Sequence, residues 1–261
     1  MSRRARVAVA LCAGALVFAA ADSAETIVRA FFQALDKRDA KAMMALLPSD
    51  AGLRRLGDDR PLANGREAFA AYLQSRFREF PNWRTKIAET MANGSWVVSR
   101  ERVTLEKGER PRETLWAFEV PEGRVRRAWA LEASAEGEEG IGGEGPVALQ
   151  IEKWNAKDLP RLLATYDEGA TVVVLATGER LASGEEALRD RFERIFESSP
   201  HLRTEVLQRM SLGPWVAYRE RTVSGPDDRK TDGIAVYEVR DGLVRRVWLL
   251  GAEGAFATPP P

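Results

Sequence analysis

Two glutamates in strand-like segments are the residues of this chain best suited to chemistry. Glu101 and Glu220 lie in segments 95–105 and 215–223, where successive side chains alternate between two faces. The face that carries the second glutamate also carries Val216, Tyr218 and Thr222. A carboxyl group held away from water must be paired with a cation or keep its proton. Either state suits a ligand anchor, and a catalytic site would use Glu220 or Glu101 as the base and Tyr218 as a hydrogen-bond donor.

The two glutamates occupy equivalent positions of an internal repeat. Residues 39–131 align without a gap on residues 158–250 at a constant offset of 119. The motif Trp-Val-Xaa-Xaa-Arg-Glu-Arg occurs at 96–102 and 215–221, and Gly-Xaa-Val-Arg-Arg-Xaa-Trp occurs at 123–129 and 242–248. This period is longer than that of solenoid repeats, so each copy is expected to be a domain with its own core.

Each copy shows helical patterns followed by strand-like ones. In the first copy, Ser23 or Asp22 and then Asp39 can cap two helices, and a third is expected over 67–80, before strands over 84–92, 95–105, 113–120 and 124–131. In the second copy, helices are expected over 147–155, 159–166 and 185–198, and strands over 171–176, 203–210, 215–223, 234–239 and 243–250. The segment 133–145 has the composition of a linker, and 253–261 that of a loose tail.

This order of elements resembles the nuclear transport factor 2-like superfamily, and its SnoaL-like and ketosteroid-isomerase-like groups most. The resemblance rests on the Asp-Gly turn at 241–242 and on the strand pattern Val-Arg-Arg-Xaa-Trp in both copies. It implies an α+β protein with two tandem cone-shaped domains, 22–132 and 146–252. In each, helices would pack on a strongly curved antiparallel sheet and leave a pocket at the open end.

The resemblance also implies where isomerase chemistry would lie. Ketosteroid isomerases use an aspartate base and an oxyanion hole made of a tyrosine and a protonated aspartic acid. In the two copies the base position falls on Arg55 and Val174, the tyrosine on Phe31 and Gln150, and the acid on Trp116 and Ala235. Since none of these six can perform the required step, isomerisation by that route is not expected.

Applied to the expected strands, the resemblance to ketosteroid isomerases predicts which polar side chains face each pocket. Glu101 is expected to meet Arg126 in the first cone, and Glu220 to meet Arg245 in the second. The other residues expected in the pockets are Glu89, Ser99 and Trp116 in the first copy, and Gln208, Tyr218 and Tyr237 in the second. Each acid and arginine would form either a structural ion pair or a polar ligand anchor in an apolar pocket.

Four tryptophans are expected on the outer sheet faces: Trp96, Trp129, Trp215 and Trp248. Large aromatic side chains on a convex face need cover. The superfamily often forms dimers through this face, so the two copies of one chain could pack as an internal pseudo-dimer. Alternatively, the neighbouring arginine stems shield each ring.

The first 21 residues differ from the rest of the chain. Three arginines precede an apolar run from Val7 to Ala20 and a small-residue stretch at 19–21, which is typical of a cleaved signal peptide. We therefore expect an exported protein, periplasmic or secreted, without a stable membrane anchor after cleavage. The single cysteine, Cys12, lies in this segment, and His201 is the single histidine, so no metal site is expected.

Composition narrows the function without naming it. Lys plus Arg and Asp plus Glu both total 39, which gives no basic bias toward nucleic acid, and no cofactor-binding motif is present. Three functions remain: non-catalytic binding of a small apolar ligand or a structural role; a small-molecule isomerase, cyclase or hydratase using Glu220 or Glu101; and a protein-assembly module.

Overall fold

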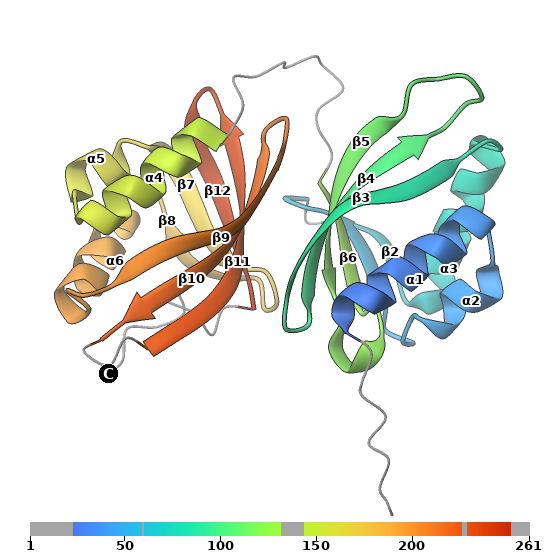
Figure 1. The fold of residues 1–261 in the computed structure, drawn as a ribbon, viewed down its shortest axis with the longest axis horizontal. Coiled ribbons are helices and arrows are strands. Elements are labelled where there is room, and N and C mark those ends of the chain that lie inside the picture. Colours follow the sequence, from blue (N-terminus) through green and yellow to red (C-terminus); the bar gives the residue numbers. More distant parts are fainter. Residues whose placement is uncertain (1–22, 59, 132–143, 226–228, 252–261) are drawn as a thin grey trace, which may run out of the picture.

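The computed structural model describes residues 23–58, 60–131, 144–225 and 229–251, which form two similar domains side by side (Figure 1). The expected signal peptide and tail, and most of the expected linker, lie outside the described residues. The last two linker positions belong to a helix, because α4 begins at Glu144. None of the helices in the described ranges is long and apolar enough to cross a membrane.

The first domain begins with three helices around a short hairpin. Its elements are α1 (Ala24–Lys37), α2 (Ala40–Ala45), β1 (Gly52–Arg55), β2 (Pro61–Asn64), α3 (Arg66–Glu79), β3 (Arg84–Asn93), β4 (Trp96–Thr104), β5 (Arg112–Glu119), the short 3₁₀ turn η1 (Pro121–Gly123) and β6 (Arg127–Leu131). Ser23 and Asp39 are the expected N-caps: their side chains accept hydrogen bonds from the backbone N–H of Thr26 and Ala42.

The second domain repeats this plan. It contains α4 (Glu144–Ala156), α5 (Leu159–Leu163), β7 (Tyr166–Val174), β8 (Glu179–Ser183), α6 (Glu185–Ser198), β9 (Arg203–Leu212), β10 (Trp215–Ser224), β11 (Arg229–Arg240) and β12 (Leu243–Leu250). The bounds of α6 and β12 agree with the expected ones. The strand β8 was not expected from the sequence, because a short edge strand carries little alternating pattern.

Each domain holds one six-stranded sheet, and the two sheets have equivalent orders. These orders are β2-β1-β6-β5-β4-β3 and β8-β7-β12-β11-β10-β9. The hairpins pair antiparallel, whereas β1 pairs with β6, and β7 with β12, in parallel. In both domains the helices lie at the outer end of the molecule, against the concave side of the sheet, and the convex sides meet in the middle (Figure 1).

Three buried clusters follow from this arrangement. One fills the interior of each domain, with Phe31 and Phe118 in the first and Trp154 and Phe192 in the second. The third cluster contains residues of both domains and therefore lies between the sheets. Burial of apolar side chains in this seam stabilises the contact between the two domains.

Two arginines hold the seam in a reciprocal manner. The Nη1 of Arg127 donates to the backbone carbonyl of Ala176 at 2.6 Å, and the Nη1 of Arg246 donates to that of Gly57 at 3.1 Å. Arg127 corresponds to Arg246, and Gly57 corresponds to Ala176, at the repeat offset of 119. The two contacts are therefore related by a pseudo-twofold axis, as in the isologous interface of a symmetric dimer.

Candidate functional site

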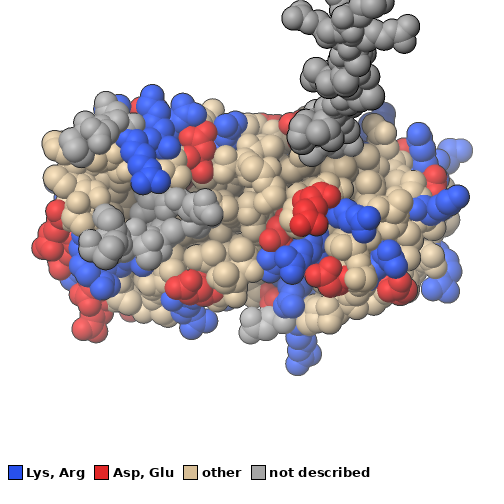
Figure 2. Space-filling model, turned by 90° about the horizontal axis from the view of Figure 1, so that it is seen from below, with Lys and Arg blue, Asp and Glu red and all other residues tan. Residues whose placement is uncertain are grey.

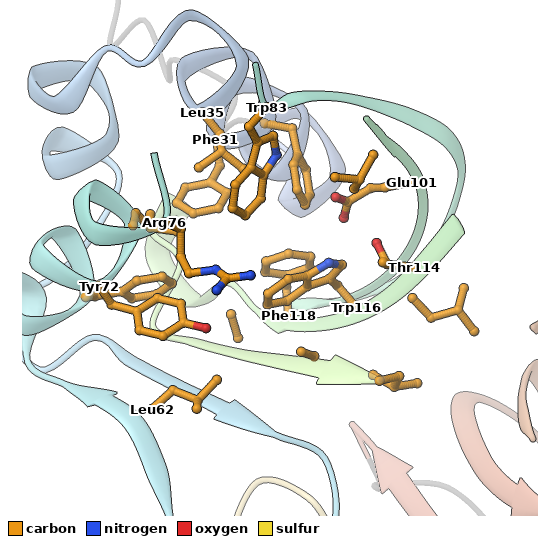
Figure 3. A pocket seen from close by; sticks show the side chains of 18 of the residues that line it. Phe31, Leu35, Leu62, Tyr72, Arg76, Trp83, Glu101, Thr114, Trp116 and Phe118 are labelled. Atoms are coloured by element: carbon orange, nitrogen blue, oxygen red, sulfur yellow. The ribbon is translucent and has the colours of Figure 1, made fainter. Parts of the chain in front are cut away.

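The first domain contains an apolar cavity of about 290 Å³ between its helices and its sheet. Its walls are mainly aromatic and aliphatic, and they include Phe31, Phe69, Tyr72, Trp83, Trp116 and Phe118 (Figure 3). The ring of Trp116 stacks on that of Phe118 with centroids 6.1 Å apart. A cavity with such walls and a few polar groups is the usual form of a small-molecule site.

Of the described residues that line this cavity, Glu101 is the one with a carboxyl group. Its side chain is 2% exposed, and its two oxygens accept hydrogen bonds from Thr85 Oγ1 at 3.1 Å and Ser99 Oγ at 3.2 Å. Burial raises the pKa of Glu101 well above its ordinary value, and the two hydroxyl donors only partly oppose this. The raised pKa favours the protonated form of Glu101, whose O–H can donate a hydrogen bond.

Three further polar groups reach the same cavity. Thr114 lies opposite Glu101 on β5, and its Oγ1 is buried without a hydrogen-bond partner among the described residues. The indole Nε1 of Trp83 is buried and has no partner there either. The guanidinium of Arg76 extends from α3 toward the middle of the cavity (Figure 3), and its Nη1 is paired with Glu79 at 2.6 Å. Because buried polar groups normally find partners, the unpartnered atoms of Thr114 and Trp83 mark where a ligand would be recognised.

The second domain also holds a buried acid, but with a different partner. Glu220 is 5% exposed and accepts a hydrogen bond of 2.7 Å from the hydroxyl of Tyr237. Burial raises its pKa from 4.5 to about 7, and the bond from Tyr237 opposes the rise. Tyr218 lies against Tyr237 with ring centroids 6.0 Å apart, and its pKa rises to about 12, chiefly through burial. Both tyrosines are neutral donors at ordinary pH.

A buried amide completes this polar group in the second domain. Gln150 is 0% exposed and lies beside the hydroxyl of Tyr166, whose pKa a hydrogen bond with Gln150 lowers against the larger rise caused by burial. The tyrosine next to Glu220, Tyr218, stands where the first domain has Ser99. Its large ring therefore lies where the first domain has a small hydroxyl side chain beside the acid.

The family model of the SnoaL-like domain matches this chain twice, over residues 28–128 and 147–247. The chain belongs to the SnoaL-like family. This confirms the expected superfamily, the α+β fold and the tandem arrangement. SnoaL-like proteins include isomerases and cyclases as well as non-catalytic members, so membership alone does not decide the reaction.

Solved structures with similar folds cover one domain each. A cystatin-fold protein from Novosphingobium aromaticivorans is 20% identical, with 42% of this chain and 98% of that chain covered and a TM-score of 0.39. A protein proposed to be a ketosteroid isomerase, from Kribbella flavida, is 21% identical, with 46% and 82% covered and a TM-score of 0.37. An NTF2-like protein from Cytophaga hutchinsonii is 13% identical, with 43% and 91% covered and a TM-score of 0.36. A comparison with curated proteins finds no match.

The expected arginine partners do not enter the SnoaL-like cavities. Arg126 pairs with Asp50 at 3.2 Å, and Arg245 lies 3.5 Å from Asp167 and 3.4 Å from Asp241, all at the surface. In the second domain the pairing with β7 shifts between Val244 and Arg246, so strict alternation ends there. A β-bulge adds one residue to one strand and turns the following side chains to the other face. The two acid–arginine pairs predicted from alternation are therefore wrong.

A second pair of bulges moves Glu89 and Gln208 out of the cavities. The register with β4 shifts between Ile87 and Glu89, and the glutamate pairs with Arg100 at 2.8 Å on the outer face. In the second SnoaL-like domain the register shifts after Arg219, and Gln208 donates from Nε2 to the carbonyl of Thr90 across the seam at 2.9 Å. The sequence carries no mark of these bulges, whereas Ser99, Trp116, Tyr218 and Tyr237 lie inside as expected.

The structure brings the four outer tryptophans together in the cluster between the domains. They are 3–6% exposed. Trp96 stacks on Trp129 and Trp215 lies against Trp248, each pair with centroids 5.7 Å apart. The guanidinium of Arg127 also lies over the ring of Trp129 at 5.4 Å. Partner domain and neighbouring arginine thus both contribute to covering these rings.

The surface charges shown in Figure 2 and the possible metal ligands do not indicate a further site among the described residues. On the face shown in Figure 2, basic and acidic side chains alternate over both domains. No group of three or more His, Cys, Asp or Glu side chains in the described ranges is arranged to hold a metal ion. The expectations of no nucleic-acid partner and no metal stay predictions.

Proposed function

We propose that the first SnoaL-like domain binds a small, flat, apolar molecule with an oxygen acceptor, and that neutral Glu101 donates a hydrogen bond to this acceptor. The observation that carries the proposal is the location of Glu101 in the wall of an aromatic cavity of about 290 Å³. Buried Thr114 Oγ1 and Trp83 Nε1, both without partners among the described residues, add donors in the same wall.

The size and chemistry of the cavity define the ligand class. A volume at the lower end of the usual range for ligand pockets admits a molecule of one to three fused rings. Aromatic walls favour a planar skeleton through offset stacking. A carbonyl oxygen is the acceptor that suits a neutral acid and a hydroxyl group, because a carboxylate ligand would have to lose its hydration beside a buried acid.

Catalysis on such a ligand is the second candidate function. In its ionised form, a carboxylate whose pKa is raised by burial is a stronger base than an exposed one, so it can take a proton from a carbon next to a carbonyl and then return it. Glu101 meets this condition, and Arg76 extends into the same space, where it would stabilise developing negative charge. The positions of the familiar isomerase groups hold Arg55, Phe31 and Trp116, so Glu101 would have to act in both directions.

Export belongs to the proposal as well. We propose that the mature protein acts in the periplasm or outside the cell, on the strength of the arginines and apolar run before residue 21. Mass spectrometry of the protein collected outside the cytoplasm would find a first residue near Asp22 or Glu25. Recovery of the intact chain with Met1 would contradict export by cleavage.

Matched ligands test the binding function. We expect α-tetralone, a bicyclic ketone, to bind more tightly than tetralin, which has the same skeleton without the carbonyl. Glu101→Leu removes the donor and should weaken α-tetralone by about fivefold in Kd, equivalent to about 1 kcal/mol for one hydrogen bond, without affecting tetralin. Glu220→Gln is the control, because it changes the equivalent acid of the other domain.

The pH dependence gives a second, independent readout. Binding of α-tetralone should weaken as pH rises through the raised pKa of Glu101, because the ionised group cannot donate. In Glu101→Gln the amide donates at all pH values, so the affinity should be constant. Equal affinities for the two ligands in the wild type, or the same loss in Glu220→Gln, would contradict the proposed site. Turnover of the ketone would favour the second candidate.

A further inference from the structure

Two hydroxyl side chains on neighbouring strands hold the carboxyl group of Glu101. Thr85 on β3 donates from Oγ1 to Oε2 at 3.1 Å, and Ser99 on β4 donates from Oγ to Oε1 at 3.2 Å. Thr85 is 4% exposed and Ser99 is 0% exposed, so water competes little for these bonds. Because each carboxyl oxygen accepts one of the two bonds, together they restrict rotation of the group.

The backbone of Thr85 is fixed in turn by the first helix. Its N–H donates to Oδ1 of Asp36 on α1 at 3.0 Å. The same helix contributes Phe31 and Leu35 to the wall of the cavity. Thr85 therefore links the helical wall of the cavity to the acid in the opposite wall. Its hydroxyl consequently has a set position relative to the space for a ligand.

The two hydroxyls approach the acid from outside the cavity. Neither Thr85 nor Ser99 is among the described residues that line the cavity, and Thr85 instead lines a groove between α1 and β3. Figure 3 shows the carboxyl group of Glu101 on the cavity side, near Thr114. A protonated carboxyl group keeps one O–H to donate besides its acceptor sites. With the outer side occupied by the two donors, the side left for this O–H is the one that faces the cavity.

The second domain keeps the backbone link but gives its acid a different donor. Thr204 is the counterpart of Thr85, and its N–H donates to Oδ1 of Asn155 at 2.7 Å. Glu220, however, accepts its hydrogen bond from the phenol of Tyr237 at 2.7 Å. The link between helix and strand is therefore part of the shared fold. The pair of small hydroxyls on the acid is a feature of the first domain.

We propose that Thr85 and Ser99 are positioning residues of the ligand site, which orient the carboxyl group of Glu101 so that its O–H points at the carbonyl oxygen of the ligand. Both act through Glu101 without touching the ligand. This inference rests on the function proposed above and adds the residues that set the strength of the hydrogen bond from the acid. A donor held in the productive direction before the ligand arrives costs less to order on binding.

The same two bonds provide a readout that a general structural role would not change. A hydroxyl donor stabilises the ionised carboxyl group, so both bonds oppose the rise that burial causes in the pKa of Glu101. Loss of either donor should raise this pKa further and extend binding to higher pH. Ionisable side chains of the neighbouring elements α1, α3 and β5 stay the same in every variant: Asp36, Tyr72, Arg76 and Arg112.

Calorimetric titration of the full chain with α-tetralone and tetralin over a range of pH tests the proposal. Thr85→Val keeps the size of the side chain and removes the hydroxyl. It should weaken α-tetralone about threefold at acid pH, a part of the loss in Glu101→Leu, and leave tetralin unaffected. The pH at which α-tetralone binding declines should be higher than in the wild type, and Ser99→Ala should have the same two effects. Thr85→Ser keeps the hydroxyl and should retain the wild-type profile.

The control is Thr204→Val, the equivalent change in the second domain, which should alter neither affinity nor profile. Unchanged tetralin affinity in Thr85→Val and Ser99→Ala establishes that the cavity is intact. A wild-type ratio of the two affinities in both variants would overturn the proposal, and so would equal weakening of both ligands with a wild-type pH profile.

A titration without ligand separates this inference from the function on which it rests. NMR of glutamate labelled at the side-chain carboxyl carbon follows the ionisation of Glu101, whose signal is identified by its absence in Glu101→Gln. A higher pKa in Thr85→Val and Ser99→Ala supports the two bonds, and an unchanged pKa in both overturns the inference. Equal affinity of the wild type for the two ligands would contradict the proposed function, whatever the NMR titration gives.

Discussion

The buried acid of the second domain makes stability depend on pH in a predictable direction. In the folded protein the pKa of Glu220 is about 7, compared with 4.5 for a solvated glutamate. Below about pH 4.5 the group is protonated in both states and has no effect. Between these values the unfolded chain loses the proton while the folded chain keeps it, so stability falls as pH rises. Above about pH 7 the loss is complete.

The magnitude follows from the two pKa values. Linkage gives a destabilisation of about 1 kcal/mol at pH 5 and about 3 kcal/mol at pH 8. Glu220→Gln keeps the size of the side chain and still accepts the hydrogen bond from Tyr237, but cannot ionise. The free energy of unfolding of this variant should therefore rise relative to that of the wild type by about 2 kcal/mol or more between pH 5 and pH 8.

Urea unfolding of both proteins at the two pH values measures this difference. Glu193→Gln is the control, because it removes an exposed carboxyl group from α6. The buried Glu101 titrates in the wild type and the variant alike, so its contribution cancels in the comparison. A difference between wild type and Glu220→Gln that stays constant from pH 5 to pH 8 would refute the reasoning.

Three further substitutions test the seam and the caps. Trp248→Ala should lower the free energy of unfolding by about 3–5 kcal/mol, as expected for a buried tryptophan, and urea unfolding measures it. Gly57→Ala should cost about 1 kcal/mol or more, because backbone strain at φ +84° is added to displacement of the Arg246 guanidinium from its bond to the Gly57 carbonyl, whereas Gly94→Ala adds strain alone; equal losses in thermal unfolding would argue against the contact. Asp39→Ala should cost about 1 kcal/mol by removing the N-cap of α2, and a loss near zero in urea unfolding would contradict that role.

The bulges explain why the site was only partly predictable from sequence. Alternation correctly placed Ser99 and Glu101 inside the first domain, because β4 keeps a regular pattern up to that point. Alternation failed for Glu89 because the register of β3 shifts between Ile87 and Glu89. It failed for Arg126 because β6 begins only at Arg127, so Arg126 lies outside the strand. Glu101 consequently has hydroxyl partners instead of an arginine, and burial raises its pKa because no cation opposes the loss of hydration.

The sequence by itself determined the duplication, the order of helices and strands, the helix caps and the family, because these depend on local spacing and on a repeat that can be read directly. Tertiary structure alone decided the raised pKa of Glu101 and the bond between Glu220 and Tyr237. Each of these depends on which strands meet, in which register, and how much water is excluded. Those quantities come from contacts between residues far apart in the chain, which no local pattern records.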